Sequence, residues 1–462
     1  MFRGKFGRVH FVGIGGSGMS GIAEVLLNLG FAVSGSDLRE GPVVQRLRGL
    51  GGKVFVGHRA ENVAGVDVVV RSTAVRDDNP EVVAAVAAKI PVIPRAEMLA
   101  ELMRMKYGLA VAGTHGKTTT TSMLATCLHK SGLDPTVVIG GRLDAFGSNA
   151  RLGRGDYLVA EADESDGSFL LLHPTVAVVT NIDPEHMEHW GTFENLVDGF
   201  VAFANRVPFY GFSVACLDHP VVQRMLPRLR RRVITYGLSA QAEVRADRIR
   251  QEGRAIAFRA WRRDTELGEL RLDVPGRHNV LNALAATAVA LDLDIPFARI
   301  EEGLRGFGGV DRRFTERANV GGVLVVDDYG HHPVEIRATL AAAAEGFEGR
   351  RLVAVFQPHR YTRVHDLLQE FCGSFNAAGH VVVCPVYAAG EHPIEGVDSA
   401  AVVKGLLEQG HRSVVGVESL DAAVDHLANV VRPGDIVVTL GAGDVNRVCL
   451  ALAARLGALH AG

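Results

Sequence analysis

The chain has 462 residues, of which 47% are hydrophobic and 22% are charged, and its formal net charge at pH 7 is −3. That length exceeds one compact core and predicts two or three domains, while the composition is ordinary for a globular α/β protein. The small net charge gives no reason to expect a nucleic-acid partner, and the lack of an apolar run of about 18 residues and of a signal-peptide pattern predicts a soluble, cytoplasmic protein without membrane insertion.

The first region, residues 1–105, alternates short apolar runs with helical stretches, which predicts a parallel sheet built from strand–helix units. Strands are expected near 9–12, 31–35, 54–56, 66–70 and 90–93. Gly13, Gly15 and Gly18 follow the first strand as G-x-G-x-x-G, and Asp37 follows at about the spacing of a ribose-binding acid. The pattern is typical of NAD enzymes, but the same backbone physics can hold other phosphates.

The second region, residues 106–308, contains a second predicted phosphate loop, "GTHGKTTTT", after the first of its strands. Gly113 and Gly116 let backbone amides turn toward a phosphate, Lys117 can reach terminal phosphates, and the Thr118 hydroxyl can bind Mg²⁺. Because Val111 stands where the full Walker pattern has glycine, the loop is a shortened variant. Strands are expected at 107–113, 157–160 and 175–180, antiparallel strands over 231–275, and a helix at 279–291.

Acidic and histidine residues follow two strands of this region. Glu161 ends the strand "YLVA" and His186 lies just beyond "TVAVVT", which places both at the carboxyl edge of a parallel sheet. A carboxylate beside a phosphate loop is a reasonable Mg²⁺ ligand, whereas imidazole is a less usual one. We interpret Asp163, Glu164 and Asp166 as ordinary loop acids, and His189 is either a site residue or a solvent-facing one.

The third region, residues 309–462, follows the glycine-rich stretch "GFGGVDRRF", which we interpret as a hinge. Strands expected at 323–326, 352–356, 380–383 and 435–440 predict another α/β domain. Asp328, at the end of its first strand, can hydrogen-bond a ribose, and Pro333 can start a helix. Arg360 and Arg363 follow the second strand and suit a carboxylate or a phosphate.

The five cysteines, at positions 127, 216, 372, 384 and 449, form no C-x-x-C pair. We expect them to be buried small hydrophobes in a reducing compartment rather than disulfide partners or metal ligands.

Six motifs in this order resemble the Mur ligases, over about residues 8–450: "GIGGSGMSGIAEVL", "GTHGKTTTTSM", "EADESDGSFL", "PGRHNVLNALAA", "DDYGHHPVEI" and "FQPHRYTR". The resemblance implies an α/β protein of three domains: a Rossmann-like N-terminal domain, a central P-loop ATPase-like domain and a Rossmann-like C-terminal domain. It also implies that the first glycine loop holds the diphosphate of a UDP-sugar, the second loop holds ATP, and the third domain brings an amino acid.

The resemblance is closest to the alanine-adding branch. It implies that ATP phosphorylates the lactyl carboxylate of UDP-N-acetylmuramate and that the amine of L-alanine attacks the acyl phosphate, in peptidoglycan precursor synthesis. Such catalysis is mainly positioning and neutralisation of phosphoryl charge. ATP and Mg²⁺ are the implied cofactors, UDP-N-acetylmuramate and L-alanine the implied partners, and a monomer or weak homodimer is expected.

The resemblance also implies roles for individual residues. Catalytic roles fall to Lys117, His186, Glu161, Arg360 and Arg363. Contacts to ATP fall to Gly113, Thr114, His115, Gly116, Lys117, Thr118, Thr119, Asn279, Asn282, Arg313 and Asp328, and the metal ligands are Thr118, Glu161 and His186. Contacts to the UDP-sugar fall to Gly13, Gly15, Gly16, Ser17, Gly18, Met19, Asp37, Ser72, Thr73 and Arg95. The amino-acid pocket consists of Tyr329, His332, Arg360 and Arg363.

Lysine usage separates the branches of the family. Several ligases that add later residues bridge magnesium with a carbamoylated lysine in the central domain, but this chain has no lysine between Lys130 and Lys404. This favours the alanine-adding branch. The alternatives are a murein tripeptide ligase of cell-wall recycling, an NAD-dependent dehydrogenase and a non-catalytic ATP-binding regulator.

Overall fold

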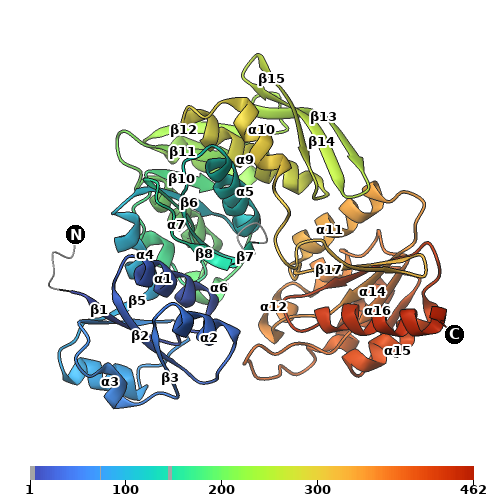
Figure 1. The fold of residues 1–462 in the computed structure, drawn as a ribbon. Coiled ribbons are helices and arrows are strands. Elements are labelled where there is room, and N and C mark those ends of the chain that lie inside the picture. The colour runs from blue at the N-terminus through green and yellow to red at the C-terminus, as the bar shows by residue number, and fades with distance from the viewer. Residues whose placement is uncertain (1–5, 73, 144–147, 462) are drawn as a thin grey trace. The chain divides into compact units, whose positions relative to one another are not determined.

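The structure is a computed structural model that describes residues 6–72, 74–143 and 148–461 (Figure 1). The chain forms two compact units. Unit 1 comprises residues 1–247, 259–270 and 281–308, and unit 2 comprises residues 248–258, 271–280 and 309–462. Within the described ranges, no helix combines the length and the apolar character that a membrane crossing requires.

Unit 1 begins with a five-stranded parallel sheet in the order β3-β2-β1-β4-β5 (Figure 1). Its strands are β1 (Arg8–Val12), β2 (Ala32–Asp37), β3 (Lys53–Val56), β4 (Val68–Arg71) and β5 (Val92–Pro94). Its helices are α1 (Ser17–Asn28), α2 (Pro42–Gly49), η1 (Ala60–Val63), α3 (Pro80–Ala87) and α4 (Arg95–Met103). All five expected strands are confirmed, with ends shifted by a few residues at most. The central strands β1 and β4 are largely buried on both faces, as parallel strands covered by helices require, whereas the edge strands β3 and β5 are partly exposed.

The second sheet has ten strands in the order β15-β14-β13-β12-β11-β10-β6-β9-β7-β8. Its strands are β6 (Tyr107–Ala112), β7 (Thr136–Leu143), β8 (Ser148–Arg151), β9 (Tyr157–Glu161), β10 (Val176–Val179), β11 (Phe212–Cys216), β12 (Arg232–Gly237), β13 (Val244–Glu252), β14 (Ala255–Arg262) and β15 (Thr265–Leu272). The accompanying helices are α5 (Lys117–Lys130), η2 (Ser168–Leu171), α6 (Met187–Trp190), α7 (Phe193–Ala204), α8 (Pro220–Met225), η3 (Leu226–Arg228), α9 (Arg277–Asp292) and α10 (Phe297–Arg305).

The prediction of antiparallel strands over 231–275 is wrong for its first strand. β12 pairs in parallel with β11 and with β13, because its apolar residues continue the buried parallel core. The strands β13, β14 and β15 are successive neighbours joined by the short turns 253–254 and 263–264. Connections this short join only antiparallel strands, so the prediction holds for the remainder of the stretch.

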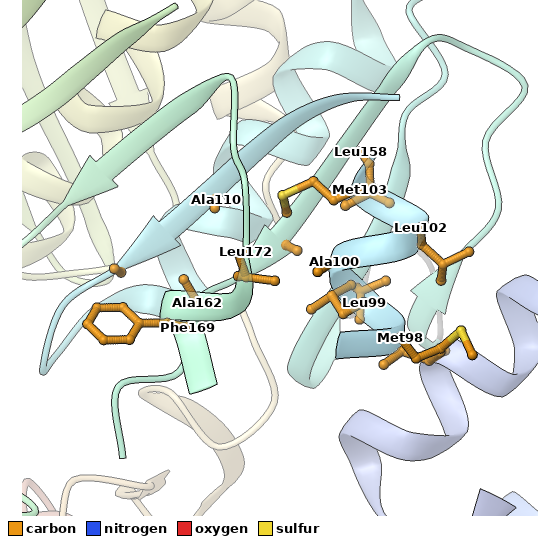
Figure 2. Close-up of a cluster of buried hydrophobic side chains, with 14 of the residues drawn as sticks. Met98, Leu99, Ala100, Leu102, Met103, Ala110, Leu158, Ala162, Phe169 and Leu172 are labelled. Carbon is orange, nitrogen blue, oxygen red and sulfur yellow. The ribbon is translucent and has the colours of Figure 1, made fainter. Parts of the chain in front are cut away.

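A continuous apolar cluster runs through both sheets of unit 1. The helix α4 contributes Met98, Leu99 and Leu102 to it, and these lie with Leu158 of β9 and Phe169 of η2 (Figure 2). The side chains are almost fully buried. The position of the first sheet within unit 1 is therefore fixed by packing through α4, beyond the covalent connection.

Unit 2 contains a six-stranded sheet in the order β16-β17-β21-β18-β19-β20, in which only the pair β16–β17 is antiparallel. Its strands are β16 (Thr315–Val320), β17 (Val323–Asp328), β18 (Leu352–Phe356), β19 (His380–Val383), β20 (Val414–Gly416) and β21 (Ile436–Leu440). Its helices are α11 (Pro333–Gly346), α12 (Tyr361–Asp366), α13 (Leu368–Cys372), α14 (Ser399–Glu408), α15 (Leu420–Val430) and α16 (Asn446–Ala461). The last boundary between the units falls at Gly308/Gly309, inside the glycine-rich stretch.

All five cysteines are free and buried, as the sequence predicts. Burial raises the pKa of the Cys127, Cys384 and Cys449 thiols to about 12 and that of Cys216 to about 11. The pKa of Cys372 is also raised by burial. The thiols therefore stay protonated and unreactive at neutral pH.

Candidate active site

The helices α1 and α5 of unit 1 begin after the two predicted phosphate loops, and neither has a side-chain cap. α1 begins after Gly16 and α5 after Gly116, and in neither does a side chain accept the first amide hydrogen bonds. Among the described helices, five others have such a cap, from Asn79, Thr192, His332, Asp398 and Ser419, while α2, α4, α8 and α10 also lack one. The first amides of a helix have no partner within it, so the starts of α1 and α5 can receive anions.

Close contacts fix the shape of the second glycine loop. Gly116 has a φ of +81°. A Cβ on it would lie 2.6 Å from Oδ1 of Asn282. Asn282 Oδ1 in turn accepts a hydrogen bond from Thr120 Oγ1 at 3.1 Å. Because both the backbone angle and the contact exclude a side chain, glycine is required here. The predicted ATP residue Asn282 thus lies against the loop, and Thr119 is buried in the first turn of α5.

The segment after β10 holds the same loop from the other side. His115 N donates to Asn181 Oδ1 at 2.7 Å, and Asp183 N donates to Thr114 Oγ1 at 2.9 Å. The two carboxylate oxygens of Asp183 lie 3.3 Å from His115 Nε2 and 3.4 Å from His219 Nε2. Burial alone would raise the pKa of Asp183, but these two histidines lower it overall. Thr114 and His115 are therefore held in place before any nucleotide binds.

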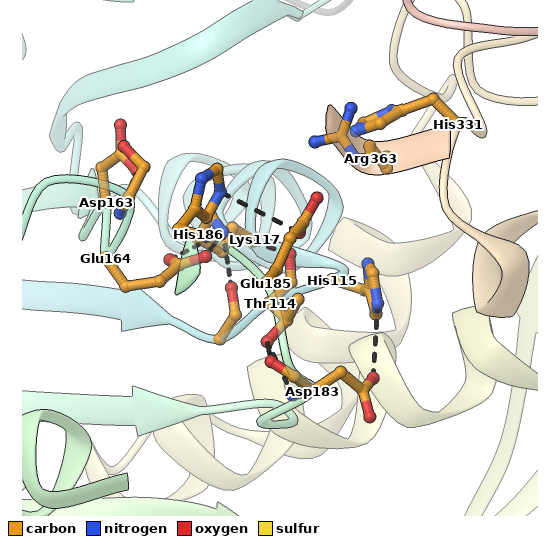
Figure 3. A network of polar contacts seen from close by, with 12 residues as sticks. Thr114, His115, Lys117, Asp163, Glu164, Asp183, Glu185, His186, His331 and Arg363 are labelled. Carbon is orange, nitrogen blue, oxygen red and sulfur yellow. Dashed lines mark hydrogen bonds and ion pairs between the residues drawn. The ribbon is translucent and has the colours of Figure 1, made fainter. Parts of the chain in front are cut away.

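Lys117 lies at the centre of this network (Figure 3). Its Nζ donates to Gly113 O at 2.5 Å, to Thr114 O at 3.2 Å, and to Glu164 Oε1 and Oε2 at 2.9 and 2.8 Å. Burial alone would lower the pKa of Lys117, but the charge of Glu164 raises it. The interpretation of Glu164 as an ordinary loop acid is therefore wrong, because its carboxylate forms a buried ion pair with the loop lysine.

The other two acids of that loop differ from Glu164. Asp166 Oδ1 accepts a hydrogen bond from Ser168 N at 3.0 Å, which is the local turn expected of a loop acid. Asp163 lies 3.6 Å from Nη2 of Arg95, one of the predicted UDP-sugar residues. Burial favours the protonated form of Asp163, but the nearby Lys117 lowers its pKa overall.

The three predicted metal ligands lie at one edge of the second sheet. Thr118 is in the first turn of α5 after β6, Glu161 ends β9, and His186 follows β10, and these strands are neighbours in the order β10-β6-β9. His186 has a φ of +58°, and its Nδ1 lies 3.7 Å from Glu188. In the described ranges, no group of three or more His, Cys, Asp or Glu side chains is preassembled around a metal position. His189 is exposed, so its solvent-facing interpretation is the one the structure supports.

Hydrogen bonds to the end of β2 hold the first glycine loop in place. Gly13 N and Ile14 N donate to Ser36 O, and Gly15 N donates to Asp37 Oδ2 at 2.8 Å. Asp37 therefore shapes the loop with one carboxylate oxygen. Met19 is buried in the apolar core, so only its backbone can face a ligand.

Of the remaining predicted UDP-sugar residues, the described ones lie at or near the start of α1. Arg95 lies against Gly18, where a Cβ would come within 2.5 Å of Nη1. Ser72 lines a cavity of about 620 Å³ that also includes Arg71, Val75 and Pro94. Thr73 lies outside the described residues. Gly16 is the N-cap residue of α1 and Ser17 its first helical residue.

In unit 2, Asp328 and Tyr329 end the strand β17. The two Asp328 carboxylate oxygens accept hydrogen bonds from Phe314 N and Gly330 N at 2.8 and 2.7 Å, and burial raises its pKa. Two guanidinium groups lie near the Tyr329 ring, that of Arg312 at 5.1 Å and that of Arg313 at 5.4 Å from its centre. Such cation–π contacts hold the ring and both arginines in one arrangement. Asn279, at the start of α9, donates to Pro275 O.

The two adjacent histidines after β17 have different environments. His332 is 4% exposed and caps α11, its Nδ1 accepting a hydrogen bond from Val334 N at 3.3 Å. The His331 ring instead lies 5.4 Å from the Tyr329 ring and 5.8 Å from the His359 ring. The sequence prediction chose His332 for the amino-acid pocket, whereas His331 is the histidine that lies beside Tyr329. The sequence itself indicated that His332 caps the helix, because Pro333 at the first helical position marks the residue before it as the cap.

Arg360 and Arg363 follow β18, as expected. Arg360 has a φ of +68°, a costly backbone conformation of the kind found at functional sites. Its Nε lies 3.7 Å from Glu391. Arg363 Nη1 donates to His359 Nδ1 at 3.1 Å. Burial, together with electrostatic interactions with His331 and the two arginines, lowers the pKa of His359 to about 4, so it is a neutral acceptor. His359 also stacks on Tyr387 at 5.5 Å. Neither was among the predicted site residues.

Three sequence models of one family match the chain in succession. They are the Mur ligase family catalytic domain at 8–107, the Mur ligase middle domain at 111–290 and the Mur ligase glutamate ligase domain at 312–443. The chain belongs to the Mur ligase family, and its fold is the three-domain α/β fold that the sequence predicts.

The curated relatives are similar to this chain over nearly its whole length and carry the name of one branch of the family. A UDP-N-acetylmuramate–L-alanine ligase of Geobacter sp. (strain M21) is 59% identical over 455 residues, which is 98% of this chain and 99% of the relative. Among solved structures, the UDP-N-acetylmuramate–alanine ligase of Thermotoga maritima matches with a TM-score of 0.81 and 31% identity, covering 98% of this chain and 99% of the other. A murein peptide ligase from Psychrobacter arcticus has the same fold, with a TM-score of 0.70 and 24% identity over 97% and 98% of the chains.

Proposed function

We propose that this protein joins L-alanine to the lactyl carboxylate of UDP-N-acetylmuramate at the expense of ATP, as a step of peptidoglycan precursor synthesis in the cytoplasm. The observation that carries the proposal is the 59% identity, over almost the full length of both chains, to a relative named for this reaction. The uncapped starts of α1 and α5, each after a glycine loop, agree with it, because the reaction needs a site for a diphosphate and a site for a triphosphate.

The two loops divide the substrates between them in this proposal. The start of α1, with Gly15, Gly18 and Arg95, receives the diphosphate of UDP-N-acetylmuramate, and Ser72 lines the adjoining cavity. The start of α5 receives the ATP phosphates. Lys117, which is held at that start, stabilises the charge of the transferring phosphoryl group, and this is where such catalysis gains most.

A divalent cation fits the carboxyl edge of the second sheet. Thr118 and Glu161 offer oxygen atoms there, and His186 offers a nitrogen, so these residues would hold Mg²⁺ together with ATP phosphates. Bound Mg²⁺ neutralises phosphoryl charge. The protein's own contribution is to present these side chains beside the carboxyl ends of three neighbouring strands of one hydrogen-bonded sheet.

The amino acid is bound by residues of unit 2 in this proposal. Tyr329, His331, Arg360 and Arg363 form the pocket, and His332 is assigned to the cap of α11 instead. Arg313 and Asp328, beside Tyr329, contact ATP, as do Asn279 and Asn282. A guanidinium suits the alanine carboxylate, which leaves the amine free to attack. The proposed domain limits are 1–105, 106–308 and 309–462, and the protein acts as a monomer or weak homodimer.

Phosphate release from ATP, with Mg²⁺ and UDP-N-acetylmuramate present, tests the function. L-alanine, glycine, L-serine and the murein tripeptide are added separately. We expect the largest kcat/KM with L-alanine, because a pocket shaped for one methyl group discriminates against a methylene change by about 1–3 kcal/mol. Release with the tripeptide alone would move the protein to cell-wall recycling, and no release with any acceptor would leave a nucleotide-binding protein without ligase activity.

A further inference from the structure

The ammonium group of Lys117 has more acceptors than protons. It carries three N–H groups, and four oxygen atoms lie within hydrogen-bond distance: Gly113 O, Thr114 O and both carboxylate oxygens of Glu164. The longest of the four distances, 3.2 Å, is the one to Thr114 O. The Thr114 carbonyl is therefore the partner that Lys117 gives up most easily when another acceptor arrives.

Glu164 cannot easily turn away from Lys117. Its side chain is 2% exposed and that of Lys117 is 17% exposed, so each charge depends on the other for its partner. The backbone of Glu164 is also fixed, because its carbonyl accepts hydrogen bonds from Trp190 Nε1 at 2.9 Å and from Gly167 N at 3.2 Å. The carboxylate is thus a rigid anchor on one side of the ammonium group.

On the basis of the function proposed above, we propose that Glu164 is a positioning residue for Lys117. Glu164 and Gly113 O hold the ammonium group, and the N–H now directed at Thr114 O becomes the donor to the terminal phosphates of ATP. Alternatively, Glu164 could be a counter-ion of Lys117 that the ATP phosphates must displace. The two roles predict opposite effects on phosphate affinity, because an anchor strengthens phosphate binding whereas a competing counter-ion weakens it.

Binding of a non-hydrolysable ATP analogue with an imido bridge between its β- and γ-phosphates, measured by calorimetry, separates the two. We expect Glu164→Gln to weaken analogue binding about tenfold and to leave AMP binding unchanged, because AMP lacks the terminal phosphates. Tighter analogue binding in the variant would overturn the proposal, as would an equal loss for AMP. Asp166→Asn, which removes a carboxylate from the same loop, is the matched control and should bind both nucleotides like the wild type.

A double-mutant comparison tests whether Glu164 acts through Lys117. In a Lys117→Met background, Glu164→Gln should cause no loss of analogue affinity and should even raise it, because an unpaired carboxylate repels phosphate. The same tenfold loss there would overturn the proposal. If Lys117→Met does not fold, Glu164→Asp serves instead. It keeps the charge but is one methylene shorter, so we expect an intermediate loss, and a loss as large as that of Glu164→Gln contradicts an anchor.

These binding measurements do not require turnover. Failure of the wild-type protein to release phosphate with L-alanine would refute the proposed function and leave the role of Glu164 standing. Failure of the wild type to bind the analogue would refute both. In turnover assays, Glu164→Gln should lower kcat while the KM for UDP-N-acetylmuramate stays the same, which a general loss of structure would not produce.

Discussion

Lys117 is the single side chain from which we expect the largest effect on activity. Lys117→Ala should abolish phosphate release, a loss of at least about 10³-fold, because the developing phosphoryl charge loses its nearest ammonium group. Binding of UDP-N-acetylmuramate, followed by calorimetry, should stay within about twofold, since that ligand is assigned to the other loop. Lys130→Ala, at the far end of the same helix, is the control. Loss of UDP-N-acetylmuramate binding in Lys117→Ala would contradict the division of substrates between the loops.

The adjacent histidines after β17 should separate stability from substrate binding. His332→Ala removes the cap of α11 and should lower the free energy of unfolding by about 1 kcal/mol with little change in the KM for L-alanine. His331→Ala should raise that KM about tenfold without changing the unfolding midpoint. Thermal unfolding and steady-state kinetics on both variants check this. If His332→Ala raises the KM and His331→Ala does not, the pocket assignment must be exchanged.

At the scale of elements, one buried carboxylate ties α3 to the first sheet. Glu81 Oε2 accepts a hydrogen bond from Ser36 Oγ at 2.5 Å and contacts His58 Nδ1 at 3.0 Å, and Oε1 accepts one from Asn62 Nδ2 at 2.5 Å. His10 Nε2 of β1 lies 3.6 Å from Oε1. Burial alone would raise the pKa of Glu81, but these partners lower it to about 2.

Glu81→Gln should therefore destabilise the first sheet, by about 3 kcal/mol at pH 7, because the variant leaves buried donors without a charged acceptor. The folded-state pKa lies below the unfolded value of 4.5, so the carboxylate adds stability above pH 4.5 and loses it as the pH falls toward about 2. Urea unfolding of wild type and variant at pH 7 and near pH 3 should show the difference shrinking. Glu40→Gln, in an exposed ion pair with Arg48, should cost less than about 1 kcal/mol at either pH.

The sequence predicts where several strands end, and therefore which site residues lie at the carboxyl edges of the sheets. Short apolar runs bounded by turn residues located β1, β6, β9 and β10, so Lys117, Glu161 and His186 could be placed at carboxyl edges of sheets. The strands β7, β8, β11, β16 and β20 were not predicted; β16 is largely polar and β20 has only three residues. The partnership of Glu164 with Lys117 could not be found in this way, because the two are 47 positions apart and only the packed sheet brings them together.

At the scale of the whole molecule, the buried thiols make the native protein inert toward thiol reagents. We expect a colourimetric thiol reagent to find essentially no reactive group at pH 7.5 in the native protein and five in guanidinium chloride, because burial removes access and keeps the thiols protonated. Reaction of one thiol in the native protein would show that its helix or strand opens locally on the timescale of the assay.

Because the native thiols do not react, introduced cysteines can be labelled selectively for spectroscopy. Val83 on α3 of unit 1 and Lys404 on α14 of unit 2 are exposed, with relative accessibilities of 53% and 76%. The variants Val83→Cys and Lys404→Cys would each present one reactive thiol, and together they would carry a donor and an acceptor fluorophore without removal of any native cysteine. Energy transfer between the dyes would then measure, in solution and substrate by substrate, whether the distance between the two units changes when each substrate binds.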